Sequence, residues 1–261
     1  MTAVRRPAVA GLFYPAEPAH LHATVDQLLA PKVSELAPPK ALIVPHAGYI
    51  YSGPTAATAY GRLYAARERI SRVVLLGPAH FVPLRGLAAP TVDAFATPLG
   101  EVRLDRAALD ALKDLPQVRL NDGAHGQEHS LEVQLPFLQR LLPAFTLVPL
   151  VVGDASPAEV AEVLERLWGG EETLILISSD LSHYHDYATA RELDARTSAN
   201  IERLRFEALE WEDACGRVPI QGLLYYARRH GLKVETLELC NSGDTAGDKR
   251  RVVGYGAYAV Q

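Results

Sequence analysis

The sequence predicts an α/β fold in which helices cover both faces of a mainly parallel central sheet. Apolar runs of strand length recur along the chain without alternating polar residues, which is typical of strands buried on both faces. Segments with helical periodicity separate these runs, and this alternation favours crossover connections between parallel strands. The apolar runs span residues 41–44, 72–76, 145–152, 173–177, 233–239 and 251–260.

The segments between the runs carry helical signals of several kinds. Residues 55–66 are rich in alanine, and 131–142 carry leucines at spacings of three and four residues. Ser156 and Pro157 stand in the order favoured for the N-cap and first position of a helix, which we expect to continue to about Trp168. Further helices are predicted over residues 19–29, 106–115 and 186–209.

The length and composition of the chain indicate one domain over residues 1–261. A chain of 261 residues, of which 48% are hydrophobic, is long and apolar enough to bury a substantial core. The segment 30–39 is rich in proline and alanine, and we interpret it as a linker between a helix and the first strand of the sheet.

Charge and hydropathy argue against two classes of partner. The formal net charge is −5 and the longest basic run covers only residues 249–251, so we expect no nucleic-acid binding. No apolar run reaches the ~20 residues that a membrane span needs, and the apolar segment 8–14 is too short for a secretory signal. Two cysteines cannot build a disulfide framework. We therefore expect a cytoplasmic protein with reduced thiols.

Polar side chains with metal-binding chemistry follow four of the predicted strands. In an open parallel sheet, the loops at the carboxyl ends of the strands form the binding crevice. If the four strands are parallel, these side chains converge on one edge of the sheet. They are His46, His80, the group of Asp180, His183 and His185, and Cys240.

A metal site is the simplest explanation of this convergence. Imidazole and thiolate together suit iron, copper or zinc, so we predict that His46, His80 and Cys240 are the ligands. The alternative for Cys240 is that of a small buried hydrophobic residue. Cys215 lies away from any predicted strand end and is assigned no role.

A second cluster is predicted to contact the ligands or the substrate. His129 and Glu132 are three residues apart at the start of a predicted helix, so they can share one face of it. They either orient a ligand or substrate, or form a hydrogen-bond network at the helix start. His185 and Tyr49, which are close in sequence to predicted site residues, are placed in the same group.

Six motifs, in order, extend from residue 6 to the last predicted strand. They are RPAVAGLFYP (6–15), PHAGYIYSG (45–53), GPAH (77–80), EHSLEVQLP (128–136), SSDLSH (178–183) and CNSGD (240–244). Together they resemble the Memo family, whose prokaryotic members are often labelled AmmeMemoRadiSam system protein B. The resemblance covers nearly the whole chain.

The resemblance implies a fold like that of the LigB-type class III extradiol dioxygenases, whose non-haem iron(II) is held by two histidines and a glutamate. By their place in the motifs, His46 and His80 correspond to the histidine ligands and His183 to the catalytic histidine. Cys240 stands where the carboxylate ligand would be, and a thiolate favours softer or more oxidised metals. The resemblance further implies copper or iron binding and, from the family label, a radical-SAM partner.

The first functional hypothesis is a metal-dependent redox enzyme that holds Fe(II) or Cu with His46, His80 and Cys240. An open coordination position would take dioxygen or a substrate, expected to be catechol-like or another small aromatic molecule. His183 would move a proton, and Asp180 would orient a neighbouring histidine.

Two alternatives stay open. A metal-binding or scaffold protein would hold a peptide or small ligand in the pocket without turnover. Cys240 favours this alternative, because a thiolate beside redox iron and dioxygen is prone to oxidation. A hydrolase would hold Zn and use Glu132 as its base, although the chain lacks a His-Glu-x-x-His motif.

Overall fold

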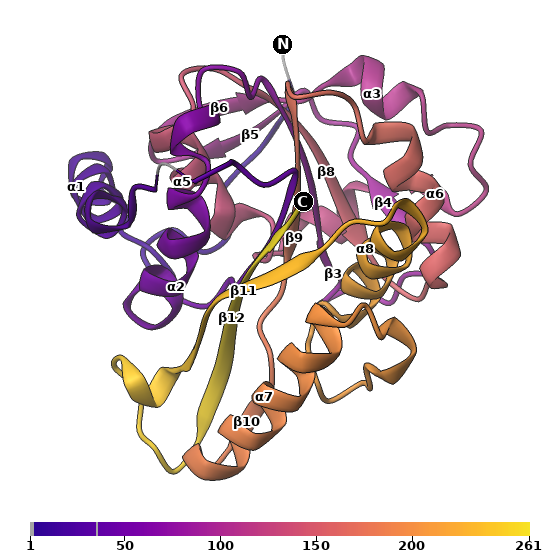
Figure 1. The fold of residues 1–261 in the computed structure, drawn as a ribbon. Helices are drawn as coiled ribbons and strands as arrows, with labels where there is room; N and C mark the ends of the chain where they lie inside the picture. Colours follow the sequence, from indigo (N-terminus) through magenta and orange to yellow (C-terminus); the bar gives the residue numbers. More distant parts are fainter. Residues whose placement is uncertain (1–2, 35) are drawn as a thin grey trace.

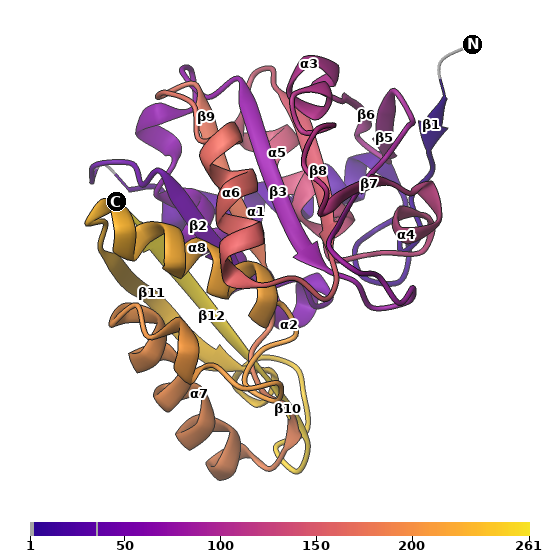
Figure 2. The same cartoon turned by 90° about the vertical axis from the view of Figure 1, so that its right-hand side faces the viewer.

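The centre of the fold is a row of four neighbouring parallel strands (Figure 1). A computed structural model describes residues 3–34 and 36–261 of the chain. The four strands end at the same edge of the sheet, toward which β3 points in Figure 2. In order across the sheet they are β2 (Ala41–Val44), β9 (Thr173–Ser178), β3 (Arg72–Pro78) and β8 (Thr146–Val152).

Antiparallel strands flank this row on both sides, so the sheet is mixed and the prediction of a mainly parallel sheet is wrong. β12 runs antiparallel to β2, and both β11 and β10 pair antiparallel with β12. A short connection leads from β11 back along β12, which requires no crossover helix. The flanking strands are β12 (Val252–Val260), β11 (Val234–Asn241), β10 (His183–His185), β4 (Leu87–Ala89) and β7 (Val118–Leu120).

Helices cover both faces of the sheet, which confirms the α/β class. In Figure 1, α1, α2 and α5 lie on one side of the central strands and α6 and α8 on the other, while α7 packs against β11 and β12. The longer helices are α1 (Pro18–Leu29), α2 (Tyr49–Gly61), α5 (Leu135–Leu141), α6 (Pro157–Leu167), α7 (Tyr187–Glu202) and α8 (Arg217–His230).

The remaining elements are short. A separate three-stranded sheet contains β1 (Val4–Arg5), β5 (Ala94–Thr97) and β6 (Gly100–Arg103). The short α-helices are α3 (Arg106–Asp110) and α4 (Asp122–Gly126), and the 3₁₀ turns are η1 (Ala30–Lys32), η2 (Tyr64–Ala66), η3 (Glu132–Gln134), η4 (Phe206–Ala208) and η5 (Ser242–Asp244). None of the helices in residues 3–34 and 36–261 has the length and apolarity to cross a membrane.

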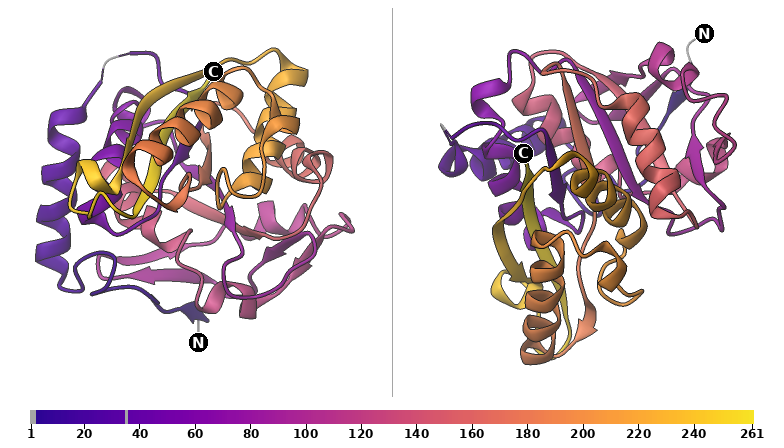
Figure 3. Two further views of the ribbon diagram at one scale, coloured as in Figure 1. Left: turned by 90° about the horizontal axis from the view of Figure 1, so that it is seen from below. Right: turned by 45° about the vertical axis from the view of Figure 1, so that its right-hand side comes forward.

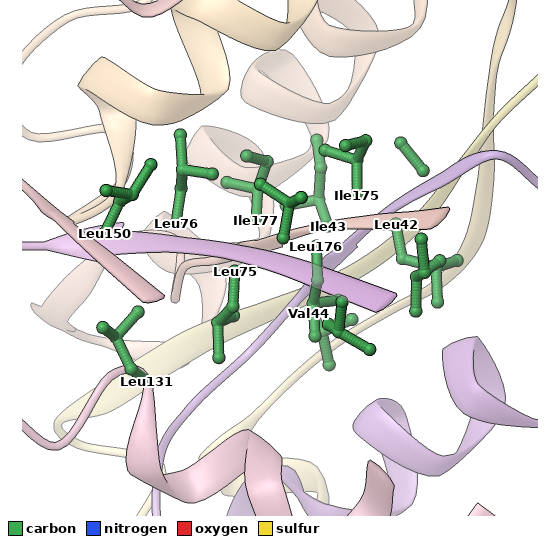
Figure 4. Close-up of a cluster of buried hydrophobic side chains, with 14 of the residues drawn as sticks. Leu42, Ile43, Val44, Leu75, Leu76, Leu131, Leu150, Ile175, Leu176 and Ile177 are labelled. Atoms are coloured by element: carbon green, nitrogen blue, oxygen red, sulfur yellow. The ribbon is translucent and has the colours of Figure 1, made fainter. Parts of the chain in front are cut away.

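The hydrophobic core fills the space on both sides of the central strands. Leu76 and Ile177 point to one side of the sheet, and Leu75 and Leu176 point to the other (Figure 4). All four side chains are fully buried. This arrangement explains the apolar runs without alternation, because each face of these strands is covered by helices.

Some predicted helix boundaries shift for local reasons. Ser156 caps α6 as predicted and forms a reciprocal capping box with Glu159. The predicted helix 186–209 ends at Glu202, and Leu204 adopts a positive φ of 54° just beyond it. Helix α8, which follows Cys215, was not predicted at all, and it proves important for the site.

Candidate metal centre

A cavity of about 1090 Å³ opens at the carboxyl edge of the central strands. This is the edge seen from below in the left view of Figure 3. Its lining comes from segments that are far apart in the sequence: the loops after β2, β3 and β9, the N-terminal segment, the start of α8 and the last part of the chain. The predicted residues among its lining are His46, His80, His129, Asp180, His183 and His185.

His46 is buried at this edge of the sheet and presents one ring nitrogen to the cavity. Its Nδ1 lies 2.9 Å from the Ser178 hydroxyl oxygen. That hydroxyl donates its only proton to the Ser130 carbonyl at 2.6 Å and accepts from the Gln134 side-chain amide at 2.8 Å. Nδ1 of His46 must therefore be the donor, which leaves the Nε2 lone pair free, 3.4 Å from the Cys215 sulfur.

The electrostatics keep His46 neutral. Burial lowers the pKa of His46 well below its ordinary value, and the nearby histidines, His80 first, lower it further. Its backbone N–H donates to Asp180 at 2.7 Å, and burial raises the pKa of Asp180. A neutral imidazole with a fixed tautomer is the form of histidine that binds metals.

His80 is oriented by Glu128, which sequence reasoning had not selected. The Glu128 carboxylate accepts from Nδ1 of His80 at 2.8 Å and from its backbone N–H at 2.7 Å. Burial alone would raise the pKa of Glu128, but the hydrogen bonds and charge of His80 outweigh it and lower the pKa to about 2. Since Nδ1 is engaged, Nε2 is the nitrogen of His80 that is left for a metal.

Cys215 lies next to the two histidines, because the start of α8 packs against the end of β9. Its sulfur accepts from the Asp180 backbone N–H at 3.3 Å. Gly216 makes this approach possible: a β-carbon there would lie 2.6 Å from the β-carbon of Ser179. Burial, followed by the charge of Asp180, raises the pKa of the Cys215 thiol, so the sulfur carries a proton until a cation replaces it.

One ligand atom each from His46, His80 and Cys215 lies within 4.8 Å of the others. The two histidine rings have centroids 5.3 Å apart and meet edge to face at 76°. Two imidazoles and a thiol form a donor set for iron, copper or zinc. Three protein ligands would leave a position open for a small molecule, as catalytic sites do.

His129 lies beside the three donors His46, His80 and Cys215 as a neighbour stacked on one of them. Its ring is stacked on His80 with centroids 4.7 Å apart. Burial, and then the proximity of His80, lowers the pKa of His129. His80, Glu128 and His129 also form a compact group of donor atoms. The hydrogen bonds between His80 and Glu128 already account for that closeness.

The structure does not bring Cys240 to the histidines. Cys240 lies on β11, which runs in the same direction as β2 because both strands pair antiparallel with β12. Strand β12 lies between β11 and the four central strands, so Cys240 is displaced sideways from the histidines. Its sulfur is 2.9 Å from the Thr55 hydroxyl, and it is not among the residues that line the cavity. Cys240 also belongs to neither of the donor groups found in the described part of the chain.

Glu132 and Tyr49 point away from the cavity. The Glu132 carboxylate is fully buried and accepts hydrogen bonds from Arg5, the backbone of the N-terminal segment and Tyr14. The Tyr49 hydroxyl donates to the Val133 carbonyl at 2.7 Å. Glu132 therefore takes part in a hydrogen-bond network with the N-terminal segment instead of facing the cavity. The hydrolase hypothesis loses the base it needs.

Cys215, Glu128 and Arg217 line or support the site, yet sequence reasoning missed their roles. A signal for Cys215 existed. It is followed by Gly216 and then Pro219 at the start of a helix, and helix starts in α/β folds face the carboxyl edge of the sheet. No local signal could have shown that Glu128 bonds the ring of His80, 48 residues away.

Comparison with known proteins gives consistent matches. A family model described as Memo-like protein matches residues 5–259. The chain is 40% identical over 264 residues to a MEMO1 family protein of Aquifex aeolicus, with 97% of each chain covered. It is 36% identical over 277 residues to a MEMO1 family protein of Sulfolobus acidocaldarius, again with 97% of each covered.

The fold is similar to that of a protein of known structure. The uncharacterized protein JW3007 from Escherichia coli K12 matches with a TM-score of 0.50 and 17% sequence identity. The match covers 82% of this chain and 98% of that chain. At this identity the likeness concerns the fold alone.

Proposed function

Because the chain belongs to the family of Memo-like proteins, we propose that it is a metal-dependent redox protein that binds iron or copper through His46, His80 and Cys215. The observation that carries the proposal is the meeting of these three donors within 4.8 Å. Cys215 takes the place that the sequence had suggested for Cys240. The expected likeness to LigB-type dioxygenases stays a prediction.

The hydrogen bonds around the three donors support a built metal site. Each histidine is held through Nδ1, His46 by Ser178 and His80 by Glu128, so that both Nε2 atoms are left for the metal. Such outer partners fix the tautomer and the ring direction of metal-binding histidines. The Asp180 N–H directed at the Cys215 sulfur would stabilise the thiolate form.

When bound, iron or copper would supply one-electron chemistry with dioxygen or an organic substrate. The chain's own part would be to hold the substrate and to move a proton. His183 lines the cavity and is half-buried, which suits a group that exchanges protons with a bound molecule. Asp180 would hold the His46 backbone in place through its hydrogen bond.

The test is metal content by mass spectrometry on untagged protein purified without oxygen. We expect near-stoichiometric iron or copper in the wild type and in Cys240→Ser, and loss of the metal in His46→Ala and Cys215→Ser. Cys240→Ser is the matched control, because it removes the other thiol of the chain. Full metal retention in Cys215→Ser would refute the proposed ligand set.

A second measurement separates a redox enzyme from a metal-binding protein without turnover. Oxygen uptake would be followed with small aromatic substrates in metal-loaded wild type and in His183→Ala. Uptake that falls at least tenfold in His183→Ala while metal content is unchanged would support the proton-transfer role. Undiminished uptake in that variant would contradict it.

A further inference from the structure

We propose that the cavity binds a ligand that carries a carboxylate, and that the side chain of Arg217, at the start of α8, receives this group. The inference rests on the proposed function in placing the ligand's reactive part over His46, His80 and Cys215. The binding itself requires no metal, so it can be tested on metal-free protein.

Arg217 lines the cavity with unused hydrogen-bonding capacity. Its Nε atom is buried without a hydrogen-bond partner, and no carboxylate of the described residues forms an ion pair with its guanidinium. The guanidinium carbon lies 5.6 Å from the centroid of the Trp211 ring, which is itself 79% exposed. A planar carboxylate in the cavity can accept from two N–H donors of a guanidinium at once.

The N-terminus of α8 adds to the attraction for an anion at the same place. Gly216 is the N-cap residue of this 14-residue helix. Its N–H donates to the Ser179 hydroxyl, and the Arg217 N–H donates to the Ala214 carbonyl, so the terminus acts on an anion through the helix dipole. Such a terminus carries a partial positive charge. Arg217 is only two residues beyond Cys215, so an anion held here would lie next to the donor group of the proposed metal site.

A second arginine, Arg251, also lines the cavity and lies over the exposed ring of Tyr184 at 4.4 Å. Like Arg217, it has no ion-pair partner among the described residues.

Three carboxyl groups also line the cavity. Asp180 accepts from the His46 N–H, Asp248 pairs with Arg250, and Glu212 is exposed. These nearby acidic groups would repel a dianion more than a monoanion, so a carboxylate fits better than a phosphate.

The test uses the fluorescence of Trp211 as a reporter within the cavity. The chain has two tryptophans, and Trp168→Phe leaves Trp211 as the only one. Metal-free Trp168→Phe protein would be titrated with benzoate and, in parallel, with the uncharged analogue benzamide. We expect benzoate to quench the signal with at least about tenfold higher affinity than benzamide, as expected for a charge-assisted hydrogen bond.

Variants then assign the carboxylate to Arg217. Arg217→Gln in the same background should weaken benzoate binding at least about tenfold and leave benzamide binding unchanged. Arg229→Gln is the matched control: Arg229 lies on the same helix over the Tyr225 ring, outside the cavity lining. Circular dichroism and thermal melting would confirm that both variants are folded.

Three results would overturn the proposal: equal affinities for benzoate and benzamide, benzoate binding unchanged by Arg217→Gln, or displacement of benzoate by an equal concentration of inorganic phosphate. Each is independent of the metal. If the protein takes up no metal but binds benzoate through Arg217, the proposed function is refuted and the carboxylate site is supported. If it takes up metal but does not bind benzoate, the carboxylate site is refuted and the proposed function is unaffected.

Discussion

Replacing Glu132 by glutamine should destabilise the protein strongly, because this carboxylate anchors the N-terminal segment. One oxygen accepts from the Arg5 guanidinium at 2.6 Å and the Ala8 N–H at 2.7 Å. The other accepts from the Val9 N–H at 3.0 Å and the Tyr14 hydroxyl at 2.5 Å. All four partners approach a side chain that is fully buried.

The magnitude follows from what glutamine cannot do. In either orientation its NH₂ group would face two donors, so two of the four hydrogen bonds are lost. The Arg5 side chain is only 5% exposed and would keep its charge without a counter-ion. Removing one partner of a buried ion pair costs about 3–5 kcal/mol, and we expect the free energy of unfolding to fall by about that amount.

The assay is urea denaturation at neutral pH of the wild type, Glu132→Gln and Asp26→Asn. Asp26 also pairs with an arginine, Arg140, at 2.9 Å, but the side chains of Asp26 and Arg140 are 44% and 29% exposed. The substitution of Asp26 should therefore cost no more than about 1 kcal/mol. Similar losses for both variants, or a loss below about 1 kcal/mol for Glu132→Gln, would refute the reasoning.

The hydrogen bonds of Glu132 also hold part of the cavity lining in place. Leu12 and Phe13 belong to the segment that Glu132 holds, and both line the cavity. The Phe13 ring lies 4.8 Å from the His129 ring. Glu132→Gln should therefore loosen this wall, which proteolysis of the N-terminal segment under native conditions would detect.

Further predictions concern the site and its pH range. Gly216→Ala should lower the melting temperature and the metal content together, because the added β-carbon forces the start of α8 away from β9. Glu128→Gln should weaken metal binding about 10–100-fold in a chelator competition, because the ring of His80 loses its acceptor. The Arg85 hydrogen bond lowers the pKa of Glu159 from 4.5 to about 2. The contribution of the ionised Glu159 to the free energy of unfolding is thus complete above pH 4.5 and is lost as the pH falls toward 2. Glu159→Gln should cost about 1 kcal/mol in urea denaturation at pH 7 and almost nothing near pH 2.

Much of the fold was predictable because the central strands carry their signal locally. The runs that became β2, β3, β8 and β9 are apolar on both faces, and that pattern requires helices on both sides. The position of β11 in the sheet was not predictable. β11 runs in the same direction as β2, but the antiparallel strand β12 separates the two, and that pairing depends on contacts across the sheet.

The residues of the site likewise fall into those that local sequence predicts and those that only long-range packing brings together. The sequence by itself determined that His46 and His80 meet, because each follows a parallel strand and parallel strands end at one edge. Only the tertiary structure decided that Cys215 joins them, that Cys240 lies against Thr55, and that Glu132 binds an N-terminal segment more than a hundred residues away. Those contacts depend on how helix α8, strand β11 and the N-terminal segment pack in space, and short-range residue patterns carry no record of such long-range packing.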